Sequence, residues 1–515
     1  MDFVVSKPMF PSYKYSSYLI ALGYFFIVIS VFNFSFKCQT IFKSIPELKS
    51  SSPSLGYECF ALFFMGEAFS YIYAEFLIYY VGYRITFKIS GTIIATFFAL
   101  TLYCNEVLIK IGAFFTGIAL GHMWISIISF LKYSRSHPWN NCITKLLTYT
   151  PILVTASIPI IGLNVFVPDD FPNEIKPSIS ETDNDDFKYL EYEHIKTVIV
   201  AKIFYEHLIE YLMLTLCGTF IFCAQPRLWK IVGIKTNSGT QIKLTLVDYN
   251  NKNDDFSKSI KSLYLGKRRI IAKSWKSDLR SIPFILFNQF MIAAYIPVFY
   301  VGAMTAYIGC ILTAGITYGD FERDITSTSN YLTLLIMFIC VGRGSAQYWV
   351  SILEKEKYNK NRRRKHFALL LTLFSFLIIT IADGFLPGDQ VDLLYGIINN
   401  KLSMSLNFLA IMRLFAISIL AVGCTLSEYY IYGYFEIIGQ VFGSKVTFMV
   451  RALHCISTAA FVLLSNFIPF VALPMILSIF LVVTTINYTK AERFLIKSIF
   501  ITQGVSQTTI TKLNN

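Results

Sequence analysis

The chain has 515 residues, of which 55% are hydrophobic and only 15% are charged. Together with a mean hydropathy of +0.55, this composition is typical of membrane proteins and excludes an ordinary soluble domain. The net charge of +13 does not indicate nucleic-acid binding, because the basic residues lie in short segments between apolar runs. The ten cysteines are scattered singly, so we expect no disulfide framework, no metal site and no cofactor.

Apolar runs of about 20 residues, long enough to cross the hydrocarbon core of a bilayer, recur along the chain. The first run lacks a signal-peptide cleavage site and is predicted to be a retained span. The predicted spans are 18–36, 56–80, 89–106, 111–131, 147–166, 200–224, 286–310, 329–353, 366–386, 406–432, 447–466 and 468–489. The sequence therefore predicts an all-α membrane protein of about twelve transmembrane helices in two six-helix halves.

The polar segments between these runs define the predicted domains and their sides. They are a tail at 1–17, a six-helix bundle at 18–224, a basic central loop at 225–283, a second bundle at 284–489 and a tail at 490–515. Alternate segments on one side hold 32 lysines and arginines, whereas those on the other side hold eight. Because cytoplasmic loops carry the excess of basic residues, we predict that both termini and the central loop are cytoplasmic. Plasma membrane and internal membranes are not distinguished.

The joint between the second and third spans holds Gly82 and Arg84 as Gly-x-Arg, preceded by Glu75 and Tyr79. It resembles a motif of the major facilitator superfamily that ends in Gly-x-Arg, although that motif has glycine and aspartate where Glu75 and Tyr79 stand. The resemblance implies the two-bundle transporter fold.

Longer stretches carry a more specific resemblance. In the first half they are "SLGYECFALFFMGEAFSYIYAEFLIYYVGYRITFKISG" and "FFTGIALGHMW", which contains Gly117, Gly121 and Trp124. In the second half they are "LLIMFICVGRGSAQYWVSILEKEKYNKNRRRKHFALL" and the last two spans. Together they resemble one branch of that superfamily, the Unc-ninety-three-like family, and within it the eleventh-type domain-containing members. This resemblance implies a multi-pass, non-enzymatic membrane protein that is either a transporter or a regulatory or escort subunit of an ion channel or receptor.

Charged residues deep within a span are costly and need a physical reason. Glu67 and Arg343 lie closest to the middle of their spans. They are candidates for a substrate or counter-ion site that faces a central cavity, and the alternative is a buried, hydrogen-bonded anchor for helix packing. Gly342 and Gly344 would let a neighbouring helix approach the guanidinium of Arg343 closely.

Three further charged residues lie nearer to the ends of their spans. Arg413, in the tenth span, is a second candidate for the cavity wall, and the alternative is that it extends to the outer interface. Arg451 and Glu428 lie near the predicted cytoplasmic ends of their spans, and we expect them to extend to the interface there.

Polar residues of the fourth and sixth spans complete the candidate set. Lys202, Glu206 and Glu210 are four residues apart and share one helix face, which would line a proton path or form a neutralised packing face. His122, near the candidate Trp124, could titrate near neutral pH, but a lone histidine within a span is more often a packing residue. The same interpretation applies to His454.

The sequence leaves two functions open and predicts no enzyme, because it contains no catalytic constellation. In the first, the protein moves an unidentified small solute by alternating access between its two halves. In the second, it keeps the transporter fold but regulates or escorts an ion channel or receptor. The predicted partners are therefore the lipid bilayer and either a solute or another membrane protein, with no nucleic acid.

Overall fold

The computed structural model describes fifteen stretches of the chain. They are residues 2–8, 12–44, 48, 54–81, 83–134, 205–224, 230–235, 245–247, 283, 286–313, 325–353, 358–385, 404–442, 445–470 and 472–502. The helices are α1 (Ser12–Ser44), α3 (Leu55–Val81), α4 (Tyr83–Leu102), α5 (Glu106–Ser134), an unlabelled helix Tyr205–Cys223, α9 (Gln289–Ala306), α11 (Ile325–Leu353), α12 (Tyr358–Phe385), α14 (Met404–Phe442), α15 (Lys445–Ser465) and α16 (Ala472–Thr502).

The predicted helical membrane architecture is confirmed. Within the described ranges, eight helices are long and apolar enough to cross a membrane. The predicted spans at 56–80, 329–353 and 366–386 also coincide with helices, namely α3, α11 and α12. The predicted span at 147–166 lies outside the described residues.

Several helices run past the predicted ends of their spans. α14 continues to Phe442, ten residues beyond the predicted end at 432, and α16 continues to Thr502 rather than ending at 489. Hydropathy marks only the part of a helix that lies in hydrocarbon, and helical hydrogen bonding continues into polar sequence beyond it. This difference changes how deep Glu428 lies within its helix.

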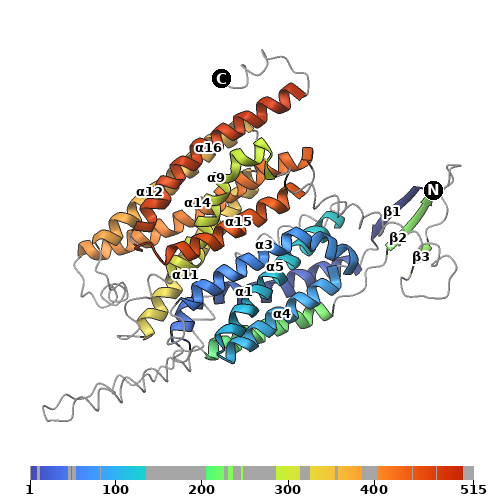
Figure 1. The fold of residues 1–515 in the computed structure, drawn as a ribbon, viewed down its shortest axis with the longest axis horizontal. Coiled ribbons are helices and arrows are strands. Elements are labelled where there is room, and N and C mark those ends of the chain that lie inside the picture. The colour runs from blue at the N-terminus through green and yellow to red at the C-terminus, as the bar shows by residue number, and fades with distance from the viewer. Residues whose placement is uncertain are drawn as a thin grey trace, which may run out of the picture.

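The helices form two groups, shown in blue to green and in yellow to red in Figure 1. The N-terminal bundle contains α1, α3, α4, α5 and the helix Tyr205–Cys223, and the C-terminal bundle contains α9, α11, α12, α14, α15 and α16. The two bundles meet mainly where α3 packs along α15, and α1 contacts the π-helical turn η1 (Tyr307–Ile311) that follows α9. Side chains on α3 and α15 therefore sit between the bundles.

The helices α3 and α5 of the N-terminal bundle pack so closely that their backbones are in contact at two glycines of α5. A Cβ atom at Gly117 would overlap the carbonyl oxygen of Phe63, and one at Gly121 would overlap the hydroxyl of Ser70. Small residues at a spacing of four let two membrane helices approach to backbone contact. This crossing carries Trp124, one turn beyond Gly121, toward α15.

Large apolar side chains cover much of the outer surface of both bundles. Phe115, Phe220, Phe374, Phe415 and Ile479 are each at least half exposed. On a soluble protein such a surface would be a liability, but here it faces the lipid acyl chains. The exposed apolar surface agrees with an integral multi-pass membrane protein.

A small antiparallel sheet stands apart from the helices, near the N-terminus in Figure 1, and was not predicted. It joins β1 (Asp2–Pro8) to β2 (Lys230–Lys235) and β2 to β3 (Thr245–Val247). Val4 pairs with Gly233 and Ile231 pairs with Leu246. The N-terminal segment and part of the central loop therefore lie at the same end of the bundles.

Candidate functional site

Polar side chains from both bundles gather where α3 and α15 pack together, and we call this group the interface cluster. Its members are Glu67, Tyr71 and Trp124 from the N-terminal bundle, and Thr305, Glu428, Tyr432, Arg451 and His454 from the C-terminal bundle. All of them except the buried Tyr71 are half-buried. An apolar collar that includes Ala68, Ile125, Phe448 and Ala452 packs beside them.

Arg451 on α15 lies at the centre of the interface cluster. Its guanidinium carbon is 4.9 Å from the ring centre of Trp124 and 4.8 Å from that of Tyr432. A cation over an aromatic face is attracted by the ring quadrupole, with a typical stabilisation of about 0.5–2 kcal/mol when partly desolvated. Because Trp124 and Tyr432 come from different bundles, this stack spans the contact between them.

A chain of hydrogen bonds extends from the stack into the C-terminal bundle. The hydroxyl of Tyr432 bonds to Nδ1 of His454, and Nε2 of His454 lies 3.0 Å from the hydroxyl oxygen of Thr305. That hydroxyl oxygen is also 3.3 Å from Oε1 of Glu428. The imidazole is thus held at both nitrogens, and the chain joins α9, α14 and α15 beside the π-helical turn η1. Such turns often occur at functional sites.

Glu67 supplies the negative charge on the other side of the contact. The hydroxyl of Tyr71 donates a 2.7 Å hydrogen bond to Oε1 of Glu67, one helical turn away on α3. The charges of Glu67 and Arg451 act on each other across the bundles, although no ion pair within 4 Å joins them in the described structure. The predicted candidates Glu67 and Trp124 thus lie in one place with Arg451.

Arg343 on α11 borders the interface cluster. Both the guanidinium of Arg343 and the carboxylate of Glu428 interact with the thiol of Cys424. A Cβ atom at Gly342 would overlap the carbonyl oxygen of Ser418, so the glycine beside Arg343 does allow the close approach of α14. Arg343 therefore reaches the same group of residues as Arg451, since the charges of both act on His454.

The other predicted candidates lie elsewhere. His122 is buried and meets the ring of Tyr73 edge to face at 5.2 Å. Arg413 is completely buried within the C-terminal bundle, so it does not extend to the membrane interface.

Two further predictions concern the sixth span and the joint motif. Nδ1 of His207 lies 3.5 Å from Oε2 of Glu210, and Glu206 shares that helix, Tyr205–Cys223, but neither glutamate belongs to the interface cluster. Arg84 is half-buried at the start of α4, and Gly82 and Lys202 lie outside the described residues.

Arg451, Glu428 and His454 are the functional candidates that sequence reasoning set aside. The expectation that Arg451 and Glu428 extend to the cytoplasmic interface was wrong, because both side chains turn into the contact between helices. Glu428 lies 14 residues before the end of α14, since the helix continues to Phe442. A helical-face argument would have found them: Arg451 and His454 are three apart, and Glu428 and Tyr432 are four apart.

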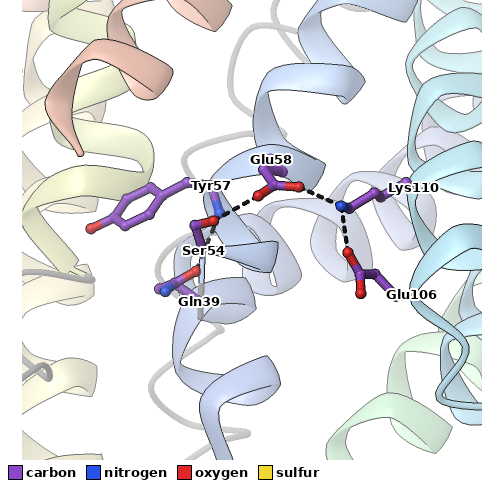
Figure 2. A network of polar contacts seen from close by, with 6 residues as sticks. All are labelled: Gln39, Ser54, Tyr57, Glu58, Glu106 and Lys110. Atoms are coloured by element: carbon purple, nitrogen blue, oxygen red, sulfur yellow. Dashed lines mark hydrogen bonds and ion pairs between the residues drawn. The ribbon is translucent and has the colours of Figure 1, made fainter. Parts of the chain in front are cut away.

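A second charged group, which we call the end network, lies at one end of the N-terminal bundle and is drawn in Figure 2. Nζ of Lys110 lies 2.6 Å from Oε2 of Glu58 and 2.5 Å from Oε1 of Glu106. Ser54 donates a 2.6 Å hydrogen bond to the other oxygen of Glu58. Its three charged side chains are about 30% exposed, and every one has an oppositely charged partner.

Comparison with solved structures identifies the fold. A nucleoside transporter, NupG, superposes with a TM-score of 0.55 at 8% identity, covering 93% of this chain and 99% of that one. A POT family transporter in complex with 5-aminolevulinic acid gives 0.55 at 11% identity, covering 92% and 96%. The Escherichia coli xylose transporter XylE gives 0.54 at 9% identity, covering 93% and 97%.

Sequence comparison adds no closer assignment, since no family model and no curated protein matches the chain. The similarity to these transporters extends over nearly the full length of each chain and is a similarity of fold. The protein is therefore an integral, multi-pass membrane protein with the major facilitator transporter fold.

Proposed function

We propose that the protein transports a small solute across a membrane by alternating access, with the interface cluster as its solute-binding site. The observation that carries this proposal is the position of the cluster. In a transporter of two bundles, a solute site that both bundles contact can open to one side at a time as the bundles rock. Glu67 and Trp124 come from one bundle, and Arg451, Tyr432 and His454 come from the other.

The energetic cost of the cluster supports a functional role. Four charged side chains, Glu67, Glu428, Arg343 and Arg451, lie within spans and lack an ion pair within 4 Å among the described residues. Charges within hydrocarbon cost about 2.5–3.5 kcal/mol each on insertion scales and are rarely present without a function. A purely structural contact would be served as well by the apolar collar alone.

The resemblance to the Unc-ninety-three-like family and the predicted orientation belong to the same proposal. Pairing of β1 with β2 supports a common side for the N-terminal segment and the central loop. The excess of lysine and arginine in these segments supports the cytoplasmic side. We expect no enzymatic activity.

An uptake experiment with purified protein in liposomes tests the proposal. A mixed pool of isotope-labelled metabolites, including nucleosides, sugars, amino acids and organic acids, is offered to the wild type and to Glu67→Gln. We expect at least one solute to accumulate with the wild type and to be lost with Glu67→Gln. The matched control is Glu106→Gln, which removes the same charge from the end network and should leave uptake within about twofold, because exposed ion pairs contribute little.

Two outcomes contradict the proposal. If no solute accumulates with well-folded wild-type protein inserted into the liposomes in either orientation, the protein does not transport the classes of metabolite offered. A regulatory role then becomes the better account. If uptake is equal in Glu67→Gln and the wild type, the protein transports but the interface cluster is not its site.

A further inference from the structure

The unpartnered polar atoms of the interface cluster and its border share one chemical character. Buried side-chain atoms that lack a hydrogen-bond partner include Nε of Arg451, Nε of Arg343 and Nε1 of Trp124. All three are N–H donors. A buried donor without an acceptor costs about 1–3 kcal/mol, so the three together indicate that an acceptor is missing from this place.

Several acceptors of the cluster already have partners. Oε1 of Glu67 accepts from Tyr71, and Oε1 of Glu428 lies within reach of the hydroxyl of Thr305 and the thiol of Cys424. Both nitrogens of His454 are hydrogen-bonded. The three N–H donors have no acceptor among the described side chains, so a ligand that brings acceptors would satisfy them.

The charges of Arg451 and Arg343 also indicate a ligand with acceptor atoms, namely an anion. No carboxylate oxygen of the described residues lies within 4 Å of a nitrogen of Arg451 or Arg343. Both positive charges act on His454, and the negative charge of Glu428 acts on it more strongly than either. An anion bound beside the two guanidinium groups would provide the close counter-charge that neither has within 4 Å among the described residues.

The aromatic stack limits the shape of that anion. The ring centres of Trp124 and Tyr432 lie 4.9 Å and 4.8 Å from the guanidinium carbon of Arg451, so both rings border the place where an anion would bind. The edge of a guanidinium matches a carboxylate in a flat, bidentate pair. A carboxylate is flat and lies in the plane of the guanidinium with which it pairs, whereas a tetrahedral phosphate places oxygens outside that plane and needs more room beside the two rings.

We propose that the solute is a small organic carboxylate whose carboxylate group binds the edge of Arg451 and the indole N–H of Trp124, with Arg343 adding positive potential. The inference rests on the proposed function in that it assigns the substrate class to the same site. A carboxylate held by Arg451 of one bundle and Trp124 of the other contacts both bundles at once. This is the contact that couples solute binding to the rocking of the bundles.

Binding of matched probes to the purified protein in detergent tests the proposal without requiring transport. The probes are benzoate, its uncharged analogue benzamide, and phenyl phosphate at equal millimolar concentration, with the melting temperature and the dissociation constant as readouts. We expect benzoate to raise the melting temperature and the other two to leave it unchanged. Arg451→Gln should weaken benzoate binding roughly 10- to 100-fold, the value of one charge-assisted hydrogen-bonded pair.

Milder variants keep the test valid if Arg451→Gln fails to fold. Arg451→Lys keeps the charge but lacks the bidentate edge, and Trp124→Phe keeps a ring but lacks the N–H, so both should weaken benzoate binding by a smaller factor. Lys490→Gln, a loss of the same charge on the exposed part of α16, is the control and should bind as the wild type does.

The outcomes separate this inference from the proposed function. Equal shifts with benzoate and benzamide, or a shift with phenyl phosphate alone, would overturn the carboxylate assignment. Uptake of an uncharged solute that depends on Glu67, without benzoate binding, would leave the transporter standing and refute the substrate class. Benzoate binding that depends on Arg451, without uptake of any solute, would support the carboxylate site and refute transport.

Discussion

The N-terminal bundle contributes to two groups of charged side chains that differ in how their charges are balanced. In the end network, Lys110 lies between Glu58 and Glu106 with both carboxylates within 2.6 Å. In the interface cluster, Arg451 contacts two aromatic rings and has no carboxylate within 4 Å in the described structure. Both groups are built on the same helix pair, because α3 carries Glu58 and Glu67 while α5 carries Lys110 and Trp124.

The difference shows how a structural charge can be told from a functional one. Charges that neutralise one another at a solvated helix end contribute little to stability and ask for no further partner. Charged side chains within a span whose N–H donors are unpaired can still gain free energy by binding a ligand that accepts those hydrogen bonds. The two groups differ in whether each charged side chain has an oppositely charged partner within 4 Å, and both contain charges.

The largest expected effect comes from breaking the helix crossing that supports both groups. Gly117→Ala places a methyl group against the carbonyl oxygen of Phe63, where there is no room, and should cost about 1–3 kcal/mol or more of folding stability. The control is Gly433→Ala on α14, where an added Cβ meets nothing within 4 Å. We expect Gly117→Ala to reduce the yield and melting temperature of purified protein strongly. Equal melting temperatures for the two variants would refute the close crossing.

A cross-link between the bundles should stop transport while leaving binding intact. The thiols of Cys38 on α1 and Cys310 in η1 interact with each other across the two bundles. A thiol-oxidising catalyst should therefore join them and abolish uptake, because the bundles can no longer rock, and a reductant should restore it. Cys310→Ser should make uptake resistant to the oxidant, whereas Cys217→Ser, at an exposed cysteine, should not. Full uptake by demonstrably cross-linked protein would contradict alternating access.

Removing one ring of the Arg451 stack should have an intermediate effect. Trp124→Leu deletes the cation–π contact and should cost about 0.5–2 kcal/mol, measured as a lower melting temperature together with weaker solute binding. Trp349→Leu is the matched control, because Trp349 is half exposed on the outer surface of α11. The stack would be energetically unimportant if both variants melted at the temperature of the wild type.

The smallest expected effect lies in the end network. Lys110→Gln removes the shared positive charge from Glu58 and Glu106, but all three side chains are about 30% exposed. Water screens the remaining repulsion, so we expect less than about 1 kcal/mol of lost stability and unchanged uptake. A loss of uptake as large as that of Glu67→Gln would remove the distinction between the two groups.

The fold could be predicted from the sequence because hydrocarbon imposes a length and a composition on every span. The depth of Glu67 and Arg343 could also be predicted, since both lie mid-span on any choice of boundaries. Arg451 and Glu428 could not be placed by hydropathy, which gives no helix ends and no tertiary partner. The stack on Trp124 is formed by residues more than 300 positions apart, and only the packing of α3 and α5 on α15 brings them together.

The pairing of β1 with β2 has a consequence for biosynthesis. The strand β1 leaves the ribosome long before its partner β2 at Lys230–Lys235. All six predicted spans of the first half lie between the two strands and are synthesised before β2. Closure of this ribbon therefore requires an even number of crossings between the two strands. If one hydrophobic segment failed to insert, an odd number of crossings would separate the two strands. β1 and β2 would then lie on opposite sides of the bilayer, and the sheet could not form.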